Sequence, residues 1–512
     1  MAVFPADCNS HDGDNPGAII GDNGWKSFEL ITLNDSLADL VLGKSYSPGN
    51  ASASGTFSWD AGIHNLWDGL GAVRTSENNL RVYVNHEGLN RATINAIDVN
   101  IPNLQTWALD FPTETAWSGP GQVVTGIGTG FSSIDVATGG SGRDLNEVPL
   151  SRLCSGNVWQ QEAFGFRRGF RDRLFLTGEE DLTTTGAGSS IWVLDTSTHV
   201  LYEAPDVSPA GGLWENACPI DSGNSNQIVL LLSSDGGTSQ LYVYVGTKNT
   251  NAGASFLARN GLVGGQIFQF DPAGDATELP ATGSMAGTFA INTTEPLVED
   301  KLEDVHVNPN NPIQAVVIDQ TDGVYQLDFD LHFNPNGTLD TANSLFEFKL
   351  LNSITNGDEL DAPDNVDWSD DGYIYINEDG FGNDAWQLDP ATGQAMRIAD
   401  GIGTETAGIK DISHLVGFQS GSIFLTNSYF GTSSNGFSGA LYMLVSPDAT
   451  KLPSVLLGDI NLDGMVDFSD ISPFISTLAS GNFQAEADTD LDSVISFSDI
   501  LPFILILNGS QE

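Results

Sequence analysis

Short segments in which apolar and polar residues alternate recur along most of this chain, and they constrain its fold more than any other feature. Alternation with a period of two is the pattern of a half-buried β-strand. Turn sequences separate the segments, among them DPAG at 271–274 and DPATG at 389–393, and the chain contains 57 glycines. Repeated short sheets punctuated in this way predict an all-β protein, and a β-propeller over residues 1–445 in particular, with a two-sheet sandwich as the alternative. The clearest strand segments are 190–195, 240–246, 266–271, 323–328, 373–377 and 422–426.

The charge balance of the chain is strongly acidic. It carries 67 Asp and Glu against 18 Lys and Arg, a formal net charge of -49. Such a surface repels nucleic acids and anionic membranes, which excludes both as partners. No segment approaches the roughly 20 apolar residues of a membrane span. The first residues contain no basic segment followed by an apolar one, so the protein is either intracellular or has lost a signal segment. Its acidity and calcium-type motifs favour a secreted protein, extracellular or periplasmic.

Acidic and amide residues gather in short clusters that follow the strand-like segments. Carboxylates placed together repel one another unless a positive charge gathers them, and basic residues are scarce here. Oxygen-rich clusters of this kind suit hard cations, calcium above all. Any single acidic pair after a strand can equally be a solvated turn, so the interpretation depends on the clusters acting together.

The pattern changes near Ser446. Residues 446–456 are predicted to form a linker, and 457–512 a small domain in which DINLDGMVDFSD at 459–470 is repeated as DTDLDSVISFSD at 488–499. Side-chain oxygens at loop positions 1, 3, 5, 9 and 12, with a main-chain carbonyl at 7, match an EF-hand-like calcium loop. The predicted ligands are Asp459, Asn461, Asp463, Met465, Asp467 and Asp470 in the first loop, and Asp488, Asp490, Asp492, Val494, Ser496 and Asp499 in the second.

Each loop is followed by an apolar, helix-like segment, and the duplicated unit resembles a type I dockerin. That resemblance implies calcium-dependent folding and docking to a cohesin-like or matrix partner. Ser493 stands where the first loop has Gly464, so we expect the second calcium site to be weaker.

Short motifs spread over about residues 60–445 resemble, in their shared order, the PhoX family of alkaline phosphatases. That family implies a six-bladed propeller whose central face holds iron and calcium around the phosphate of a phosphomonoester. The motifs are VNHEG at 84–88, RLCSG at 152–156, FLTGEE at 175–180, WEN at 214–216, LEDV at 302–305, PDN at 363–365 and INEDG at 376–380.

The resemblance also implies roles for individual residues. Cys154, Glu179 and Glu215 correspond to ligands on the iron side, and Glu180 is a further ligand. Lys301 stands where the family usually has arginine, a residue suited to contacting phosphate, and lysine lacks the bidentate fork. The residues that would mostly hold calcium are Glu87, Asp235, Glu303, Asp304, Asp364, Asn365 and Glu378.

Two other functions remain open from the sequence. One is a non-catalytic, calcium-stabilised propeller that serves in adhesion or in a matrix, and the other is a calcium-only phosphatase such as a propeller phytase. The chain has three cysteines. We expect Cys8 to pair with Cys218, which leaves Cys154 as either a thiolate ligand or a small buried apolar residue.

Overall fold

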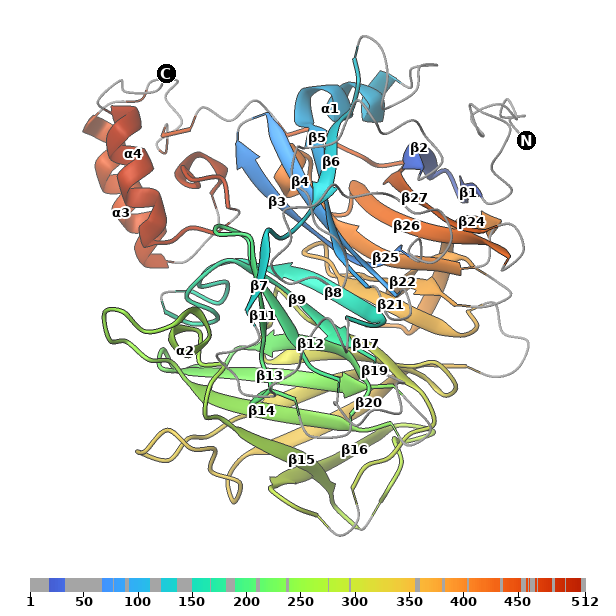
Figure 1. The fold of residues 1–512 in the computed structure, drawn as a ribbon, viewed down its shortest axis with the longest axis vertical. Helices are drawn as coiled ribbons and strands as arrows, with labels where there is room; N and C mark the ends of the chain where they lie inside the picture. Colours follow the sequence, from blue (N-terminus) through green and yellow to red (C-terminus); the bar gives the residue numbers. More distant parts are fainter. Residues whose placement is uncertain are drawn as a thin grey trace.

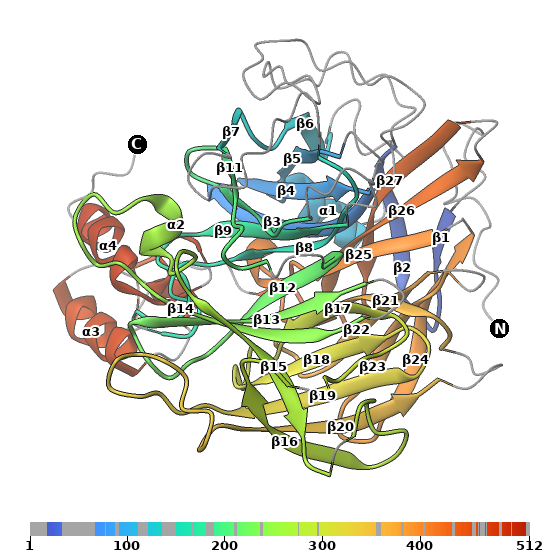
Figure 2. The same ribbon diagram turned by 60° about the horizontal axis from the view of Figure 1, so that its bottom comes forward.

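The computed structural model presents a mostly β protein whose sheets are arranged around a common centre (Figures 1 and 2). The six strand segments predicted from alternation are all strands, and the arrangement is that of a propeller rather than a two-sheet sandwich. The structure describes residues 18–32, 67–76, 78–87, 92–110, 121–135, 150–165, 167–180, 189–208, 212–235, 239–274, 276–293, 296–354, 360–379, 383–402, 405–432, 436–452, 457–458, 460, 466, 468–480, 484–492 and 494–507.

Four sheets of four or five strands make up most of the ring. The first has the order β3 (Trp67–Ser76), β4 (Asn79–His86), β5 (Ile94–Asn100) and β6 (Val124–Thr129). The second has the order β7 (Ser133–Asp135), β11 (Val200–Glu203), β10 (Trp192–Asp195), β9 (Leu174–Glu179) and β8 (Leu153–Trp159). The third has the order β1 (Ala18–Gly21), β24 (Gln394–Ile402), β23 (Ala385–Asp389), β22 (Ile374–Glu378) and β21 (Pro363–Trp368). The fourth has the order β2 (Lys26–Thr32), β27 (Gly436–Val445), β26 (Ile423–Thr432) and β25 (Glu405–Asp411).

The fifth sheet has nine strands, and it corrects the expectation of six separate blades. β16 pairs with β20, and this pairing joins two units into one sheet whose edge strands are β12 and β17. Asn216 of β12 donates a side-chain hydrogen bond to the carbonyl of Val305 in β17, so the sheet nearly closes on itself. Its order is β12 (Trp214–Ile220), β13 (Gln227–Ser234), β14 (Leu241–Thr247), β15 (Gln266–Pro272), β16 (Ser284–Ala290), β20 (Leu345–Ser353), β19 (Gly323–Asp330), β18 (Gln314–Asp319) and β17 (Leu302–Val307).

The start of the described chain completes two sheets formed by its later part. β1 pairs with β24 and β2 pairs with β27, both antiparallel. Trp25, between these two strands, packs in one hydrophobic cluster with Tyr375 and Phe424 from the two sheets. The N-terminal strands β1 and β2 therefore join the two sheets formed by the later part of the chain, through main-chain hydrogen bonds and a shared hydrophobic cluster.

One edge strand of each smaller sheet, and both edges of the nine-stranded sheet, face the centre. These strands neighbour one another in a closed circle, in the order β3, β8, β12, β17, β21 and β25. Side chains that point inward from their ends are consequently brought together from every part of the ring.

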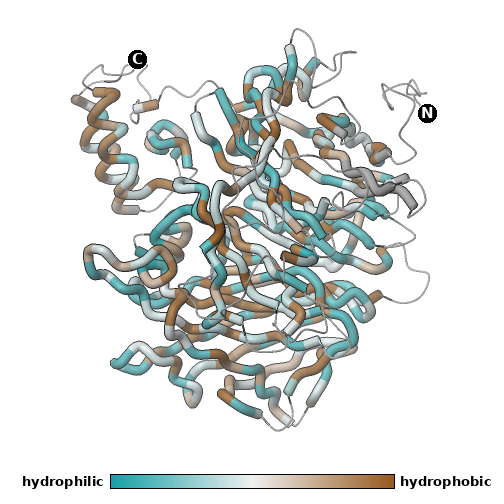
Figure 3. Tube along the Cα trace, viewed as in Figure 1, coloured by the Kyte–Doolittle hydropathy of each residue, from teal (hydrophilic) through white to brown (hydrophobic). Residues whose placement is uncertain are grey.

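The helices lie outside the sheets, and Figure 1 places α3 and α4 side by side at one edge of the molecule. The rings of Phe474 in α3 and Phe503 in α4 stack with centroids 4.2 Å apart, and both helices are largely hydrophobic (Figure 3). None of the helices in the described ranges has the length and apolar character needed to cross a bilayer. The helices are α1 (Ile101–Asp110), α2 (Phe256–Arg259), α3 (Ile471–Ser480) and α4 (Ile500–Leu507), with 3-10 turns at His414–Val416, Phe468–Asp470, Ala485–Ala487 and Phe497–Asp499.

Candidate metal centre

Five of the central strands begin with an irregularity in their pairing. The register with the neighbouring strand shifts within the first residues of β3, β8, β12, β17 and β21. A β-bulge of this kind bends the strand and re-aims a side chain, and bulges are frequent next to functional sites. The second residue of each of these strands bears a carboxylate or a thiol: Asp68, Cys154, Glu215, Glu303 and Asp364.

The first group of candidate ligands comprises Glu87, Cys154 and Glu180, with one ligand atom of each within 4.8 Å of the others. Arg152 lies against it, with Nη1 3.1 Å from Glu180 Oε2 and Nε 2.8 Å from Glu87 Oε1. Arg152 has φ 47°, the left-handed region that bulky residues rarely adopt. The backbone is therefore strained at Arg152, which carries the guanidinium and lies two residues before the thiol of Cys154.

The second group comprises Glu215, Glu303 and Asp364, again with one ligand atom each within 4.8 Å. All three side chains are buried. Lys301 approaches the group, with Nζ 2.5 Å from Glu303 Oε1 and 3.9 Å from Asp379 Oδ2. Lys301 thus pairs with one of the three carboxylates, and the group keeps an excess of negative charge.

The pKa values of these groups report the same excess. Burial, followed by the charges of Asp364 and Glu215, raises the pKa of Glu303 well above its ordinary value. Burial likewise raises the pKa of Glu215 to about 7, although hydrogen bonds from Ser155 act against the shift. Burial and then Glu180 raise the pKa of the Cys154 thiol. Carboxylates and a thiol gathered in this way ionise together when a cation joins them, as metal ligation requires.

Asp235 lies close enough to act on both groups, because its charge raises the pKa of Glu180 and of Glu303. It follows directly on β13, one strand outward from β12. Of the sequence-predicted residues, the structure therefore brings Glu87, Cys154, Glu180, Glu215, Asp235, Lys301, Glu303 and Asp364 to the centre.

Asp304 and Asn365 lie beside the groups but are occupied by the protein itself. Asp304 Oδ1 accepts from the amide of Val305 at 2.7 Å and from the side chain of Asn216, and Oδ2 accepts from the amide of Val366 at 2.9 Å. Asn365 donates to Asp68 Oδ1 at 3.1 Å and accepts from the amide of Gly408 at 2.7 Å. Both side chains link neighbouring central strands, which positions the residues beside them.

Glu179 and Glu378 point away from the two groups. Glu179 accepts from the amide of Ser151 at 3.0 Å and from Trp192 Nε1 at 2.9 Å. Glu378 accepts from the amides of Asp361 at 2.7 Å and Asp384 at 3.2 Å. Each is the last residue of its strand, and the acidic residue after it lies at the centre instead.

Asp68, Glu405 and Arg152 are central residues that the sequence interpretation missed as site residues. Burial, followed by Asp364, raises the pKa of Asp68, and burial followed by Glu87 raises the pKa of Glu405. The sequence could have identified Asp68 as a site residue, because Trp67-Asp68 repeats the aromatic-acidic pair Trp214-Glu215. For Glu405, which begins β25 after a Gly-Thr segment, the sequence offers no comparable mark.

The strands approach each other closely at the centre, and glycine makes this possible. A Cβ atom on Gly178 would lie 2.1 Å from the carbonyl oxygen of Trp214 and 2.4 Å from that of Glu215. At this position only a residue without a side chain fits.

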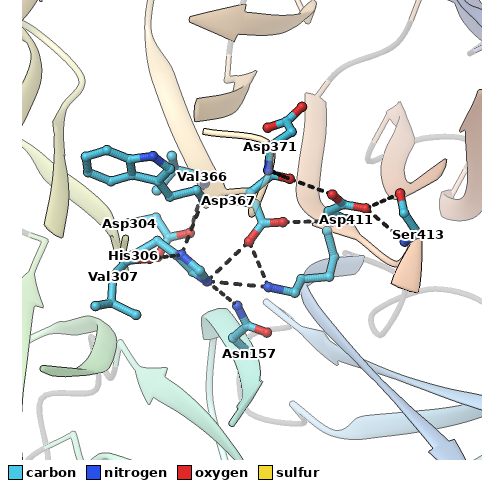
Figure 4. A network of polar contacts seen from close by, with 12 residues as sticks. Asn157, Asp304, His306, Val307, Val366, Asp367, Asp371, Asp411 and Ser413 are labelled. Atoms are coloured by element: carbon cyan, nitrogen blue, oxygen red, sulfur yellow. Dashed lines mark hydrogen bonds and ion pairs between the residues drawn. The ribbon is translucent and has the colours of Figure 1, made fainter. Parts of the chain in front are cut away.

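A buried polar network continues along the central strands beyond the acidic groups (Figure 4). Lys410 Nζ lies 2.7 Å from Asp367 Oδ1, and His306 Nε2 lies 3.2 Å from the same oxygen. Asn157 contacts His306 Nε2 at 2.9 Å, and Trp159 stacks on the His306 ring with centroids 5.2 Å apart. The network fills the middle of the ring with groups from four of its strands, β8, β17, β21 and β25.

The second of the two predicted calcium loops brings three of its acidic residues together. Asp488, Asp490 and Asp492 each offer one oxygen within 4.8 Å of the others. Burial, then Asp490 and Asp488, raise the pKa of Asp492 to about 9. Asp499 Oδ1 accepts from the amides of Thr489 and Asp490, and Oδ2 from the amide of Ser496 at 2.8 Å. Val494, also in the second loop, donates its amide to Asp492. Of the predicted ligands in the first loop, the structure describes Asp470, which is buried. The others lie outside the described residues: Asp459, Asn461, Asp463, Met465 and Asp467.

Cys218 is a free, buried thiol in the largest hydrophobic cluster, so the expected pairing with Cys8 is wrong. Its position in the middle of β12 places it among apolar side chains from several strands. Cys8 itself lies outside the described residues.

Comparison with known proteins finds likeness in structure and none in sequence. No family model and no curated sequence matches the chain. Pseudomonas fluorescens PhoX, solved in complex with vanadate, a transition state analogue, aligns over 84% of this chain and 96% of its own, with a TM-score of 0.54 and 12% identity. Two other solved structures are less similar. Penicillium chrysogenum α-L-arabinanase has a TM-score of 0.35 and 11% identity, and the alignment covers 74% of this chain and 96% of its own. Puromycin hydrolase has a TM-score of 0.32 and 14% identity, and the alignment covers 73% of this chain and 44% of its own. The chain thus shares the fold of PhoX.

Proposed function

We propose that this protein is a metal-dependent alkaline phosphatase of the PhoX type, which hydrolyses phosphomonoesters at a calcium and iron centre. One observation carries the proposal. The central strands deliver carboxylates and one thiol to a common place, and the described cationic side chains that pair with them are Arg152 and Lys301. The shared fold with PhoX supports the same conclusion.

The two groups differ in the metal that they suit. Glu87, Cys154 and Glu180 combine a thiolate with carboxylates, and sulfur ligation favours iron over calcium. Glu215, Glu303 and Asp364 offer oxygen alone, which calcium prefers. This division assigns Glu215 to calcium, whereas the resemblance in sequence placed it beside iron.

A phosphomonoester is a dianion, which this acidic chain repels with its own side chains. When bound, the cations would supply the positive charge that neutralises the phosphoryl oxygens. The protein's part is to fix the ligands: Ser155 donates its amide to Glu215 Oε1 at 3.1 Å, and Asp304 and Asn365 hold neighbouring strands in register. Arg152 and Lys301 place N–H donors at the edges of the two groups, and in this proposal these donors would contact the phosphoryl oxygens.

The test is hydrolysis of an aryl phosphate at alkaline pH by protein reconstituted with calcium and iron, with metal content measured on the same sample. We expect turnover that chelation abolishes, and we expect Glu215→Gln to lose it while keeping a wild-type circular dichroism spectrum. Protein shown to hold both metals that does not hydrolyse the ester would contradict the proposal.

The second candidate is a non-catalytic, calcium-stabilised adhesion or matrix protein. Two observations favour it: Lys301 is already paired with Glu303, and the C-terminal unit exposes apolar side chains at positions related by its repeat. These are Phe468 and Phe497, and Ile475 and Ile504. Calcium-dependent binding to a partner, with no bound iron and no turnover, would favour this function.

For the C-terminal unit we propose a dockerin-like role. In this division 1–445 form the propeller, 446–456 a linker and 457–512 a calcium-binding module that docks to a cohesin-like or matrix partner, outside the cell or in the periplasm. Its support is the cluster of Asp488, Asp490 and Asp492, together with the stacked helices α3 and α4. Calcium titration of the whole protein, followed by circular dichroism and by binding to immobilised cohesin, tests both parts of this role.

A further inference from the structure

Three further carboxylates gather in the nine-stranded sheet and form a group distinct from the two central ones. Glu299 lies just before β17, Asp319 ends β18, and Asp322 lies in the turn between β18 and β19. One oxygen of each lies within 4.8 Å of the others. Glu299 and Asp319 are buried, whereas Asp322 is exposed and opens the cluster to solvent.

Asp319 has one oxygen that the protein leaves without a partner. Oδ1 accepts from the amide of Thr321 at 2.9 Å, from its hydroxyl at 2.7 Å and from the amide of Asp322 at 3.1 Å. Oδ2 is buried, and no hydrogen-bond donor among the described residues reaches it. A buried acceptor left in this way is costly, so Oδ2 is the oxygen that Asp319 can offer to a ligand.

Two other hairpin turns show what this turn lacks. Asp195 and Asp389 each accept an amide hydrogen bond from the residue two positions later, as Asp319 does. In both, a threonine three positions later also donates its hydroxyl to Oδ2: Thr198 at 2.8 Å and Thr392 at 2.9 Å. Asp322 occupies that position after Asp319, and an ionised carboxylate has no proton to donate. Here the donor that completes the turn has been replaced by a second acceptor.

The surrounding charges make the cluster unfavourable by itself. Burial, followed by Asp319, Asp322 and Glu278, raises the pKa of Glu299 to about 8, although the Leu279 amide donates to it. Burial also raises the pKa of Asp319, whereas in Asp195 the turn's hydrogen bonds outweigh burial and lower it. A cation would take the place of the missing donor and offset the repulsion.

We propose that Glu299, Asp319 and Asp322 bind a calcium ion that fastens the start of β17 to the turn between β18 and β19. All the side-chain donors are oxygens, which selects a hard divalent cation. The turn already contacts this segment, because the amide of Gln320 donates to the carbonyl of Lys301 at 2.9 Å. The ion would therefore steady the backbone that carries Lys301 and Glu303, whether or not the centre is catalytic.

The test is the number of calcium ions bound per chain, measured by equilibrium dialysis in the wild-type protein and in Asp322→Thr. The variant supplies the hydroxyl that the other turns have, so we expect it to fold and to bind one calcium fewer. We expect its melting temperature in chelator to equal or exceed that of the wild type, and to rise less when calcium is added.

Two further variants keep this test independent of folding and of the other sites. Glu299→Gln should also lose one calcium, whereas Asp389→Asn, which alters a turn of the same kind without a carboxylate cluster, should lose none. Unchanged calcium stoichiometry in both Asp322→Thr and Glu299→Gln would overturn the proposal. Aryl phosphate turnover does not enter the result, so the phosphatase proposal and this one can fail separately.

Discussion

Glu179 and Glu180 are adjacent in sequence, yet their carboxylates lie on opposite sides of the strand end. Glu179 accepts from Trp192 Nε1 at 2.9 Å within its own sheet, whereas Glu180 pairs with Arg152 at 3.1 Å and joins Glu87 and Cys154. Glu378 and Asp379 repeat the arrangement in another sheet. Because side chains alternate across a strand, one member of each acidic pair supports the sheet and the other faces the centre.

The pair predicts opposite effects for two matched substitutions. Glu180→Gln should reduce bound metal and lower aryl phosphate turnover at least tenfold, with little change in melting temperature. Glu179→Gln should keep metal and activity but lose about 1–3 kcal/mol of stability, because a charged acceptor of two buried hydrogen bonds is weakened. Metal analysis and thermal denaturation of both variants check this. Equal metal loss in the two would contradict the assignment.

Much of the fold could be predicted from the sequence, because alternation marks strands directly. Alternation does not encode strand partners, so the β16–β20 pairing that joins two units escaped prediction. The same period of two could have separated Glu179 from Glu180 in advance. The bulges that aim Asp68 and Glu303 inward depend on pairing between strands, and no local pattern reports them.

Cys154 and Cys218 offer a second matched comparison. Both are buried free thiols, but Cys154 lies with Glu87 and Glu180, and Cys218 lies in a hydrophobic cluster. Cys154→Ala should abolish iron binding and turnover while the protein remains folded. Cys218→Ala should retain both and lose only about 1 kcal/mol from the small cavity that it creates. Iron retained in full by Cys154→Ala would exclude the thiol as a ligand.

The stability of the chelated protein should fall as pH rises. Burial raises the pKa values of Glu215, Asp304 and Glu378 to about 7, above the values near 4 of an unfolded chain. Between about pH 4 and 7 the folded, metal-free chain therefore binds more protons than the unfolded chain, and its stability declines toward neutral pH.

Metal binding needs Glu215 in its deprotonated form, so the stabilising effect of the metal should grow over the same pH range. We expect the difference in melting temperature between metal-loaded and chelated protein to be larger at pH 8 than at pH 5.5. A difference that is equal at both pH values would show that Glu215 does not couple to the metal.

Lys301 should act on substrate binding more than on folding. Its Nζ contacts Glu303, and its charge is outnumbered by the carboxylates around it. Lys301→Met should raise KM for an aryl phosphate about tenfold, because the donor proposed for the phosphoryl oxygens is lost, and Lys301→Arg should restore or improve KM. Steady-state kinetics on variants with equal metal content measure this effect. An unchanged KM in Lys301→Met would show that Lys301 does not contact the substrate.

Lys410 should stabilise the fold by compensating a buried charge. Asp367 is buried, and Lys410 Nζ lies 2.7 Å from its Oδ1. Burial, aided by Lys410, lowers the pKa of His306 to about 4, so this second neighbour of Asp367 is neutral at pH 7. Lys410→Met should therefore leave Asp367 without a charged partner and cost about 3–5 kcal/mol at pH 8.

The same substitution should weaken the pH dependence that His306 gives the wild type. Without Lys410, the repulsion that lowers the pKa of His306 disappears while the attraction of Asp367 remains, so the pKa of His306 rises. A histidine whose folded-state pKa lies below its unfolded value costs the fold stability at low pH, and this cost shrinks as the folded-state pKa rises toward the unfolded value. The destabilisation of Lys410→Met relative to wild type should thus be smaller at pH 5.5 than at pH 8. Urea denaturation of metal-loaded proteins at both pH values measures it, and adding His306→Gln should remove the difference.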